Sequence, residues 1–249
     1  MKKYFFLGGL DLEMVEIKKI LEAEGINFED KNLGWGAKAS AYSEEIIDAV
    51  NDGFTPVLVE LELDVELPKG IVVIDHHGQR ASEPPSIKQV LDLLGLEADR
   101  WQKLVGANDA GYIPAMLVIG ATEEEVAQIR AADRSAQGIT PEQEDEAERA
   151  ISSAEKIGSL VVIRMSHSKC ATVSDRLFGT WPDGRENLLV LSEDGEVNFF
   201  GNGALCTDLK EKFEGWNGGS GLGDSEGIAF WGGYPNHNDV LNFVVEKVK

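Results

Sequence analysis

Short apolar runs alternate with helical segments through the first half of the chain, and this alternation constrains the fold more than any other feature. The run Tyr4–Leu7 ends at two glycines, as a buried strand does where it enters a loop. Apolar positions then recur at helical spacing from Leu12 to Ala23, and Gly25 ends that helix. Similar patterns predict strands at 56–63 and 70–75 and helices at 43–50, 85–94 and 99–105. The alternation implies crossover connections, and therefore an α/β fold with a mostly parallel sheet flanked by helices.

The pattern of predicted helices and strands changes near residue 138. Two further helices are expected at 122–136 and from Thr140 to about Lys156, and we interpret 138–158 as a helical linker with little core of its own. Beyond it, strands are predicted at 160–165, 187–191 and 196–200, and a closing helix at 239–247. The chain is therefore expected to form a domain at 1–137 and a smaller α/β domain at 159–249, across a cleft from the first.

The charge of the chain restricts its partners. Its 249 residues contain 23 Lys and Arg against 44 Asp and Glu, which gives a net charge of −21. Such acidity argues against binding to duplex nucleic acid or to an anionic membrane, because affinity for phosphate backbones comes from Lys and Arg. Small anionic substrates remain compatible if a metal or a local basic pocket receives them. Two isolated cysteines, and no apolar stretch near the ~20 residues of a membrane span, predict a soluble cytoplasmic protein.

Acidic residues follow the predicted strands at the points where these strands end. Asp11 and Glu13 come after the first strand, Glu60 lies in the second, and Asp75-His76-His77 follows the run Ile71–Ile74. Because ligands bind beyond the carboxyl ends of parallel strands, these side chains and Asp109 are expected to converge. Carboxylates that converge repel one another unless a cation is present. Mn²⁺, Co²⁺ or Mg²⁺ suits oxygen and imidazole ligands, and two ions about 3.5–4 Å apart would form a clamp for attack on phosphorus.

These segments, in this order, resemble the four motifs of the DHH phosphoesterase superfamily. The resemblance covers roughly the first 115 residues, and it implies a metal-binding domain at 1–137 with one or two Mn²⁺ ions. It implies that Asp75 bridges two ions, that His76 is a ligand or lies beside the metals, and that His77 meets the phosphate. The implied metal ligands are Asp11, Glu13, Glu60, Asp75, His76 and Asp109.

The chain differs from the usual family pattern at three positions. Leu7 stands where the family usually has a His, and Glu13 and Glu60 stand where it usually has Asp. A site with a single ion is therefore an alternative to a site with two. Other interpretations also remain open, because Glu60 fits a half-exposed strand, Glu13 fits the first turn of a helix, and Asp109 fits a turn before a glycine.

Two groups of residues in the C-terminal part are candidates for binding the substrate. A locally basic cluster could hold a phosphorylated substrate by charge-assisted hydrogen bonds, and a glycine-rich loop could present N–H groups to a phosphate. That loop also resembles, more faintly, the DHH-associated substrate-binding domain. Solvated charges and a flexible turn are the alternatives. The candidates are Arg164, His167, Lys169 and Arg176 in the cluster and Gly218, Gly219, Ser220 and Gly221 in the loop.

The sequence therefore favours a metal-dependent phosphoesterase with His76 and His77 as catalytic residues. Its substrate would be a small nucleotide-type phosphodiester or phosphomonoester, such as a short oligonucleotide or a cyclic dinucleotide. The first alternative is a degenerate, non-catalytic module that binds a nucleotide or a protein. A second alternative, inorganic pyrophosphatase, is disfavoured because Ser166–Lys169 is at best a remnant of the basic motif found in that branch.

Overall fold

The computed structural model describes residues 2–34, 36–177, 187–219 and 221–248. The chain forms two compact units, Met1–Gly138 and Ile139–Lys249. Each unit has its own sheet and its own apolar cores, so each is described separately. No helix in the described ranges is both long enough and apolar enough to cross a membrane.

The sheet of the first unit is parallel throughout. Its strands are β1 (Lys3–Leu7), β2 (Asn27–Asp30), β3 (Thr55–Val59) and β4 (Val72–Ile74), in the order β2-β1-β3-β4. This arrangement confirms the predicted α/β class. Leu7 pairs with Val59, and Val59 pairs with Ile74, so three strands end level with one another. The residues that follow these strands therefore leave the sheet at one edge.

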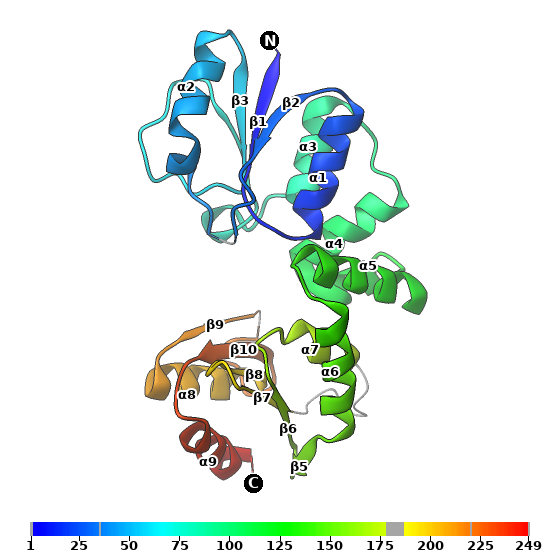
Figure 1. Ribbon diagram of the computed structural model, residues 1–249, viewed down its shortest axis with the longest axis vertical. Helices are drawn as coiled ribbons and strands as arrows, with labels where there is room; N and C mark the ends of the chain where they lie inside the picture. Colours follow the sequence, from blue (N-terminus) through cyan, green and yellow to red (C-terminus); the bar gives the residue numbers. More distant parts are fainter. Residues whose placement is uncertain (1, 35, 178–186, 220, 249) are drawn as a thin grey trace. The chain divides into compact units, whose positions relative to one another are not determined.

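Helices cover both faces of this sheet, and the alternation of side chains along β1 explains why. Phe5 and Leu7 point into a core shared with α1 (Leu12–Ala23), α3 (Ser86–Leu94) and α4 (Arg100–Val118). Phe6 points the other way, into a core with α2 (Ser43–Asn51). Figure 1 shows α2 on one side of the strands and α1 and α3 on the other.

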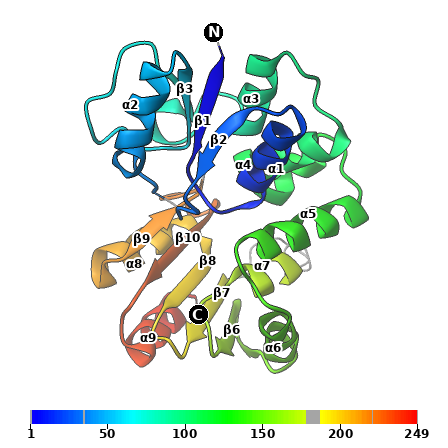
Figure 2. The same cartoon turned by 45° about the horizontal axis from the view of Figure 1, so that its top comes forward.

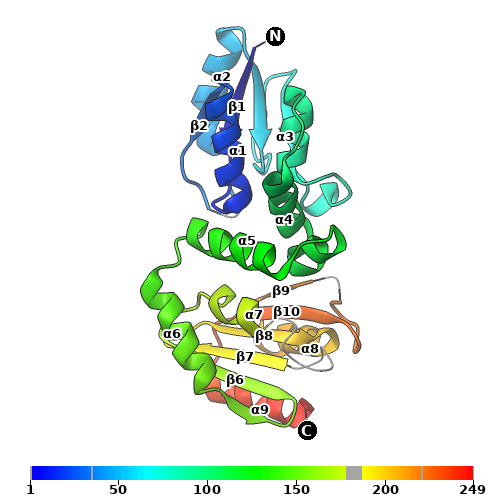
Figure 3. The same ribbon diagram turned by 90° about the vertical axis from the view of Figure 1, so that its right-hand side faces the viewer.

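Two helices complete this unit, one longer than predicted and one close to its predicted bounds. The helix expected at 99–105 continues as α4 to Val118, with a break at Gly111 and Tyr112, whose backbone angles are not helical. Helix α5 (Glu123–Ala136) begins with a capping box made by Thr122 and Glu125. It crosses the first turn of α1 and packs against α4, as Figure 3 shows.

The described part of the second unit contains a mixed sheet of six strands. Their order is β5-β6-β7-β8-β10-β9, and only β6 and β7 pair in parallel among the described residues (Figure 2). The strands are β5 (Glu155–Ile157), β6 (Leu160–Met165), β7 (Asn187–Ser192), β8 (Val197–Asn202), β9 (Trp216–Gly218) and β10 (Ile228–Gly233). Helices α6 (Pro141–Ser152) and α7 (Ala171–Leu177) cover one face, and α8 (Gly203–Phe213) and α9 (His237–Val248) cover the other.

The segment interpreted as a linker contains α6 and β5, both of which lie in the second unit. Ala147 and Ala150 of α6 pack against Val161 and Ile163 of β6. Because alanines bury little apolar surface, this packed face is hard to recognise in a helix so rich in acidic residues.

Candidate metal centre

Two candidate ligands leave neighbouring strands at the same edge of the first sheet. Glu60 follows β3 directly, and His76 comes two residues after β4. The amide of Glu60 donates to the carbonyl of Ile74 at 2.9 Å, which fixes the two strand ends against each other. Glu60 also has a positive φ of 53°, a conformation that is strained for a residue with a side chain. The chain thus holds this carboxylate in place at a cost in backbone strain.

The loop after β1 lies close against Glu60. A Cβ atom on Gly8 would lie 2.5 Å from the carbonyl oxygen of Glu60 and 2.7 Å from the side chain of Leu61. Gly9 has a φ of +100°, and a Cβ there would lie 3.5 Å from Glu60 Oε2 and 3.8 Å from Asp11 Oδ2. The two glycines therefore allow the backbone of this loop to approach the acidic side chains.

Two helices bring further carboxylates to this edge. Glu13 lies in the first turn of α1 and is only 2% exposed. Its Oε1 atom accepts a hydrogen bond from the amide of Ile87 in α3 at 3.0 Å, which leaves Oε2 for another partner. Asp109 lies in α4, just before the break at Gly111. Both positions place a carboxylate beside His76.

Four side-chain atoms converge around the ring of His76. Its Nε2 atom lies 2.5 Å from Asp109 Oδ2, 3.4 Å from Glu60 Oε1 and 3.7 Å from Glu13 Oε2. All four atoms are buried, and none has a hydrogen-bond partner among the described residues. Buried polar atoms are normally hydrogen-bonded, so four that point at one another require an explanation. Three carboxylate oxygens and an imidazole nitrogen are suitable ligands for a divalent cation, and the arrangement fits one.

His77 extends the same group. Glu60, His76, His77 and Asp109 each offer a ligand atom, and these atoms lie within 4.8 Å of one another. The rings of His76 and His77 are 4.2 Å apart between centroids. These four residues, together with Glu13, are called the candidate metal centre below.

The electrostatics of the candidate metal centre favour a positive charge in its middle. Burial raises the pKa of Glu13 well above its usual value, and the charges of Asp109 and Glu60 raise it further. Burial alone would lower the pKa of His76, but contacts with Asp109 and Glu60 raise it to about 10. Burial would raise the pKa of Glu60, but contacts with His76, Glu13 and Ser86 together lower it below its usual value. A protonated His76 thus offsets the carboxylates, as a metal cation would.

The structure gives Asp11 and Asp75 other contacts. Asp11 caps α1, because its Oδ1 accepts a hydrogen bond from the amide of Met14 at 2.9 Å. Burial is the largest of the effects that raise the pKa of Asp11 to about 6. Asp75 Oδ1 accepts from the amide of His77 at 2.9 Å and lies 3.2 Å from His77 Nδ1. Asp75 therefore orients His77. That Asp11 and Asp75 bind metal stays a prediction from sequence.

Leu7 is 1% exposed and packs in the apolar core of the first unit. This is the position at which the resembled family usually supplies an imidazole. The side chain of Leu7 contributes only apolar contacts, so this strand end adds no further ligand.

Three buried residues next to the segments of the candidate metal centre were not predicted from the sequence. Asp133 of α5 accepts a hydrogen bond from the amide of Leu12 at 3.2 Å through Oδ1. Arg130 Nη1 donates to Asp133 Oδ2 at 2.7 Å and to Asn108 Oδ1 at 2.8 Å. A signal was present, because Arg130 and Asp133 continue the apolar stripe of α5 that includes Val126. Charged residues on the buried face of a helix point to a specific partner.

The basic residues predicted to bind the substrate have differing surroundings in the second unit. Arg164 is exposed on β6, and His167 and Lys169 lie in the turn that follows, where His167 Nδ1 accepts from the amide of Lys169 at 3.2 Å. Arg176 of α7 donates to Glu144 at 2.7 Å, so its guanidinium already has an acidic partner. Their role in binding a substrate stays a prediction.

The predicted glycine loop adjoins β9, which is the edge strand of the same sheet at the opposite end from β5. Gly218 ends the edge strand β9, and Gly219 has a φ of +106°. Gly221 packs against the backbone of Gly227 and Ile228. Ser220 lies outside the described residues. The role of this loop in phosphate binding also stays a prediction.

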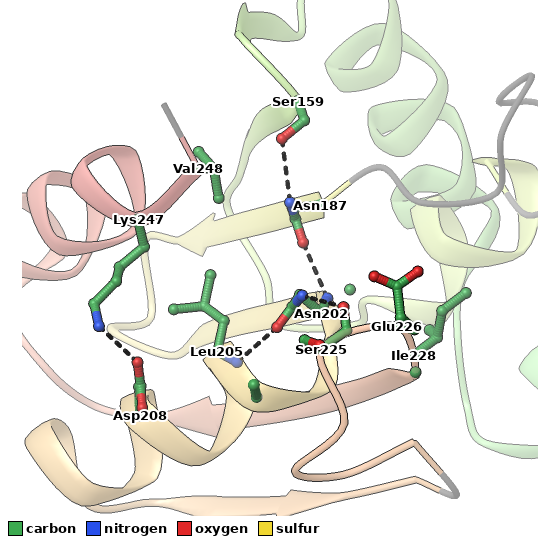
Figure 4. A pocket seen from close by; sticks show the side chains of 13 residues that line it. Ser159, Asn187, Asn202, Leu205, Asp208, Ser225, Glu226, Ile228, Lys247 and Val248 are labelled. Carbon is green, nitrogen blue, oxygen red and sulfur yellow. Dashed lines mark hydrogen bonds and ion pairs between the residues drawn. The ribbon is translucent and has the colours of Figure 1, made fainter.

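A separate pocket of about 370 Å³ lies in the second unit, and Figure 4 shows its lining. Asn187 spans it, accepting from the amide of Asn202 and donating to Ser159, while Lys247 pairs with Asp208. Of the predicted site residues that the structure describes, none lines this pocket. The side chains of Asn187, Lys247 and Asp208 already have partners within the unit. The pocket is distinct from the candidate metal centre, because its lining residues all belong to the second unit.

No protein-family model matches the sequence, and a comparison with curated proteins gives no match. Among solved structures, the chain is similar to the pGpG-specific phosphodiesterase PggH from Vibrio cholerae, with a TM-score of 0.45, 10% identity and coverage of 100% of this chain and 99% of that one. It is similar to RecJ from Thermus thermophilus in complex with Mg²⁺, with a TM-score of 0.41, 12% identity and coverage of 99% and 50%. An uncharacterized protein from Helicobacter pylori gives a TM-score of 0.29, 12% identity and coverage of 99% and 98%. At these TM-scores and identities, the likenesses carry no functional argument. The proposed function below rests on the geometry of the candidate metal centre.

Proposed function

We propose that this protein is a metal-dependent phosphoesterase that hydrolyses a small nucleotide-type phosphodiester or phosphomonoester. The convergence of four buried atoms without hydrogen bonds at the carboxyl edge of a parallel sheet supports this proposal. Glu13, Glu60, His76 and Asp109 would hold the cation, with His77 beside them. A divalent cation bound there would act as a Lewis acid and stabilise the negative charge that develops on a phosphoryl group.

His77 is the residue best placed to touch the substrate. Its side chain is half exposed, whereas that of His76 is almost fully buried. Because a carboxylate only accepts hydrogen bonds, Asp75 places a proton on His77 Nδ1 and leaves Nε2 to face a ligand. When the ring is protonated, Nε2 donates a hydrogen bond to a phosphate oxygen. Asp75 thus orients the group that binds the phosphate.

The chemistry of the site also bears on the metal and on the substrate. Mixed carboxylate and imidazole ligands suit Mn²⁺, with Co²⁺ and Mg²⁺ as further candidates. The net charge of −21 disfavours a long polyanion, since each added phosphate is repelled by the surface. A short substrate with one or two phosphates experiences less of this repulsion.

The proposal is tested by metal binding and hydrolysis in the same preparation. Calorimetry with Mn²⁺ is expected to show binding, and Asp109→Asn is expected to abolish both this binding and the hydrolysis of a panel of linear and cyclic dinucleotides and nitrophenyl phosphates. The matched control is Asp92→Asn on α3, because Asp92 is exposed and pairs only with Lys88 among the described residues. Absence of binding and of hydrolysis with Mn²⁺, Co²⁺ and Mg²⁺ would refute the proposal.

The non-catalytic alternative is favoured by one specific observation. Leu7 supplies no imidazole, and the ligand atoms of Glu60, His76, His77 and Asp109 lie within a space that suits a single ion. Such a protein would bind Mn²⁺ tightly and still leave every substrate in the panel intact. Release of phosphate from pyrophosphate, measured with malachite green, would instead support the pyrophosphatase alternative.

A further inference from the structure

A buried ion pair on α5 connects the two helices that carry ligands of the candidate metal centre. Arg130 is 7% exposed and Asp133 is 5% exposed, and Arg130 Nη1 lies 2.7 Å from Asp133 Oδ2. Neither side chain forms a hydrogen bond with the four converging atoms. Each one contacts a chain segment that does, and these contacts suggest its role.

Asp133 holds the segment that carries Glu13. Its Oδ1 atom accepts a hydrogen bond from the amide of Leu12, the first residue of α1. This amide is one of those that a helix cannot satisfy internally at its N-terminus. Because Leu12 directly precedes Glu13, the hydrogen bond fixes where the first turn of α1 begins and so where the carboxylate of Glu13 lies.

Arg130 holds the segment that carries Asp109. Its Nη1 atom donates to Asn108 Oδ1 at 2.8 Å, one residue before Asp109. The guanidinium also lies over the ring of Tyr112, 4.7 Å from its centre. Tyr112 has a positive φ of 58° and forms the break in α4 just after Asp109. Arg130 thus contacts the chain on both sides of Asp109.

We propose that Arg130 and Asp133 are positioning residues of the candidate metal centre, so this inference rests on the proposed function. Apolar residues of similar size can replace a buried ion pair with little loss of stability, and often with a gain. Stability alone therefore does not explain why charges occupy the buried face of α5. Replacement of a residue that orients a metal ligand typically weakens metal affinity by about 10- to 100-fold.

The test removes the pair without leaving a buried charge. The double variant Arg130→Met/Asp133→Leu is expected to keep the denaturation midpoint close to that of the parent. Its dissociation constant for Mn²⁺, measured by calorimetry, is expected to rise about 10- to 100-fold. The matched control is Arg100→Met/Glu125→Leu, which removes the ion pair between Arg100 of α4 and Glu125 of α5, neither of which belongs to the candidate metal centre. The control is expected to keep the parental affinity.

A second measurement needs no metal. Amide hydrogen exchange of the metal-free protein is expected to become faster at residues 10–14 and 106–113 in the Arg130→Met/Asp133→Leu variant and to stay unchanged there in the control. This measurement separates the two proposals. If the parent binds no Mn²⁺, the proposed function fails, while hydrogen exchange still tests the positioning role.

Two outcomes would overturn the positioning role: parental Mn²⁺ affinity in a folded double variant, or parental exchange in both segments. If the double variant does not fold, the single variant Asp133→Asn tests the positioning role by the same two measurements. The asparagine keeps an acceptor for the amide of Leu12 but loses the charge that pairs with Arg130. Weaker Mn²⁺ binding and faster exchange at 106–113 would then support the role, and parental behaviour would refute it.

Discussion

At the scale of single residues, the candidate metal centre depends on backbone positions as much as on its ligands. Glu60 is held at a positive φ, and its carbonyl oxygen leaves no room for a side chain on Gly8. A carboxylate in this position therefore requires a glycine on the neighbouring strand end. The consequence is that a residue with no functional group can be as important as a ligand.

Gly8→Ala tests this dependence. The added methyl group would clash with Glu60 and Leu61, so the ends of β1 and β3 would be forced apart. We expect a loss of about 1–3 kcal/mol in the free energy of unfolding, measured with urea, together with weaker Mn²⁺ binding. Gly34→Ala is the control, because a Cβ atom there has nothing within 4 Å. Equal midpoints for the two variants would contradict the role of Gly8.

The sequence predicted the types of residue at this site better than their contacts. Glu13, Glu60, His76 and Asp109 could be chosen because each follows or adjoins a predicted element, and the structure brings all four together. The hydrogen bond from Ile87 to Glu13 spans 74 positions in the chain, and that from Leu12 to Asp133 spans 121. Such contacts depend on how helices pack, which local patterns do not encode.

At the scale of elements, apolar strands were predicted better than polar or glycine-rich ones. Strand β6 begins with four consecutive apolar residues, Leu160–Ile163, and was predicted with its correct bounds. Strand β2 (Asn27–Asp30) was not predicted, because it is a polar edge strand with a single neighbour. Strand β10 was also missed, since its glycines are atypical of strands. Helix α8 follows directly from β8 and was not predicted, although Gly201-Asn202-Gly203 marks the junction and Asn202 caps the helix.

The junction between α4 and α5 predicts a dependence of stability on pH. Hydrogen bonds from Arg100 lower the pKa of Glu125 from 4.5 to about 2. Because the folded pKa is the lower one, Glu125 stabilises the fold above pH 4.5, and this contribution is lost as the pH falls towards 2. Glu125→Gln should therefore lower the urea midpoint at pH 7, and the difference from the parent should narrow between pH 5 and pH 3.

Glu124→Gln is the control for this experiment. It removes a charge from the same first turn of α5, so it reproduces any effect on the helix dipole without touching Arg100. A difference between Glu125→Gln and the parent that stays constant from pH 7 to pH 3 would contradict the assignment.

At the scale of the whole molecule, the chain separates into two units, and each candidate ligand lies in the first. Residues 1–138 expressed alone are therefore expected to fold and to bind Mn²⁺ within about threefold of the affinity of the full chain, since no ligand is lost. Calorimetry on both proteins, with Asp109→Asn in each as the control, measures this. A fragment that folds but binds far more weakly would show that the second unit contributes to the centre.

The burial of Glu13 and His76 has a consequence for any ion that they hold. The half-exposed His77 is the part of the candidate metal centre that faces solvent, so an ion would enter and leave on that side. Its exchange would be slower than at an open surface site, because the remaining ligand side chains are nearly buried. The metal content of a purified sample would then still reflect the growth medium, unless the protein is dialysed against a chelator before elemental analysis.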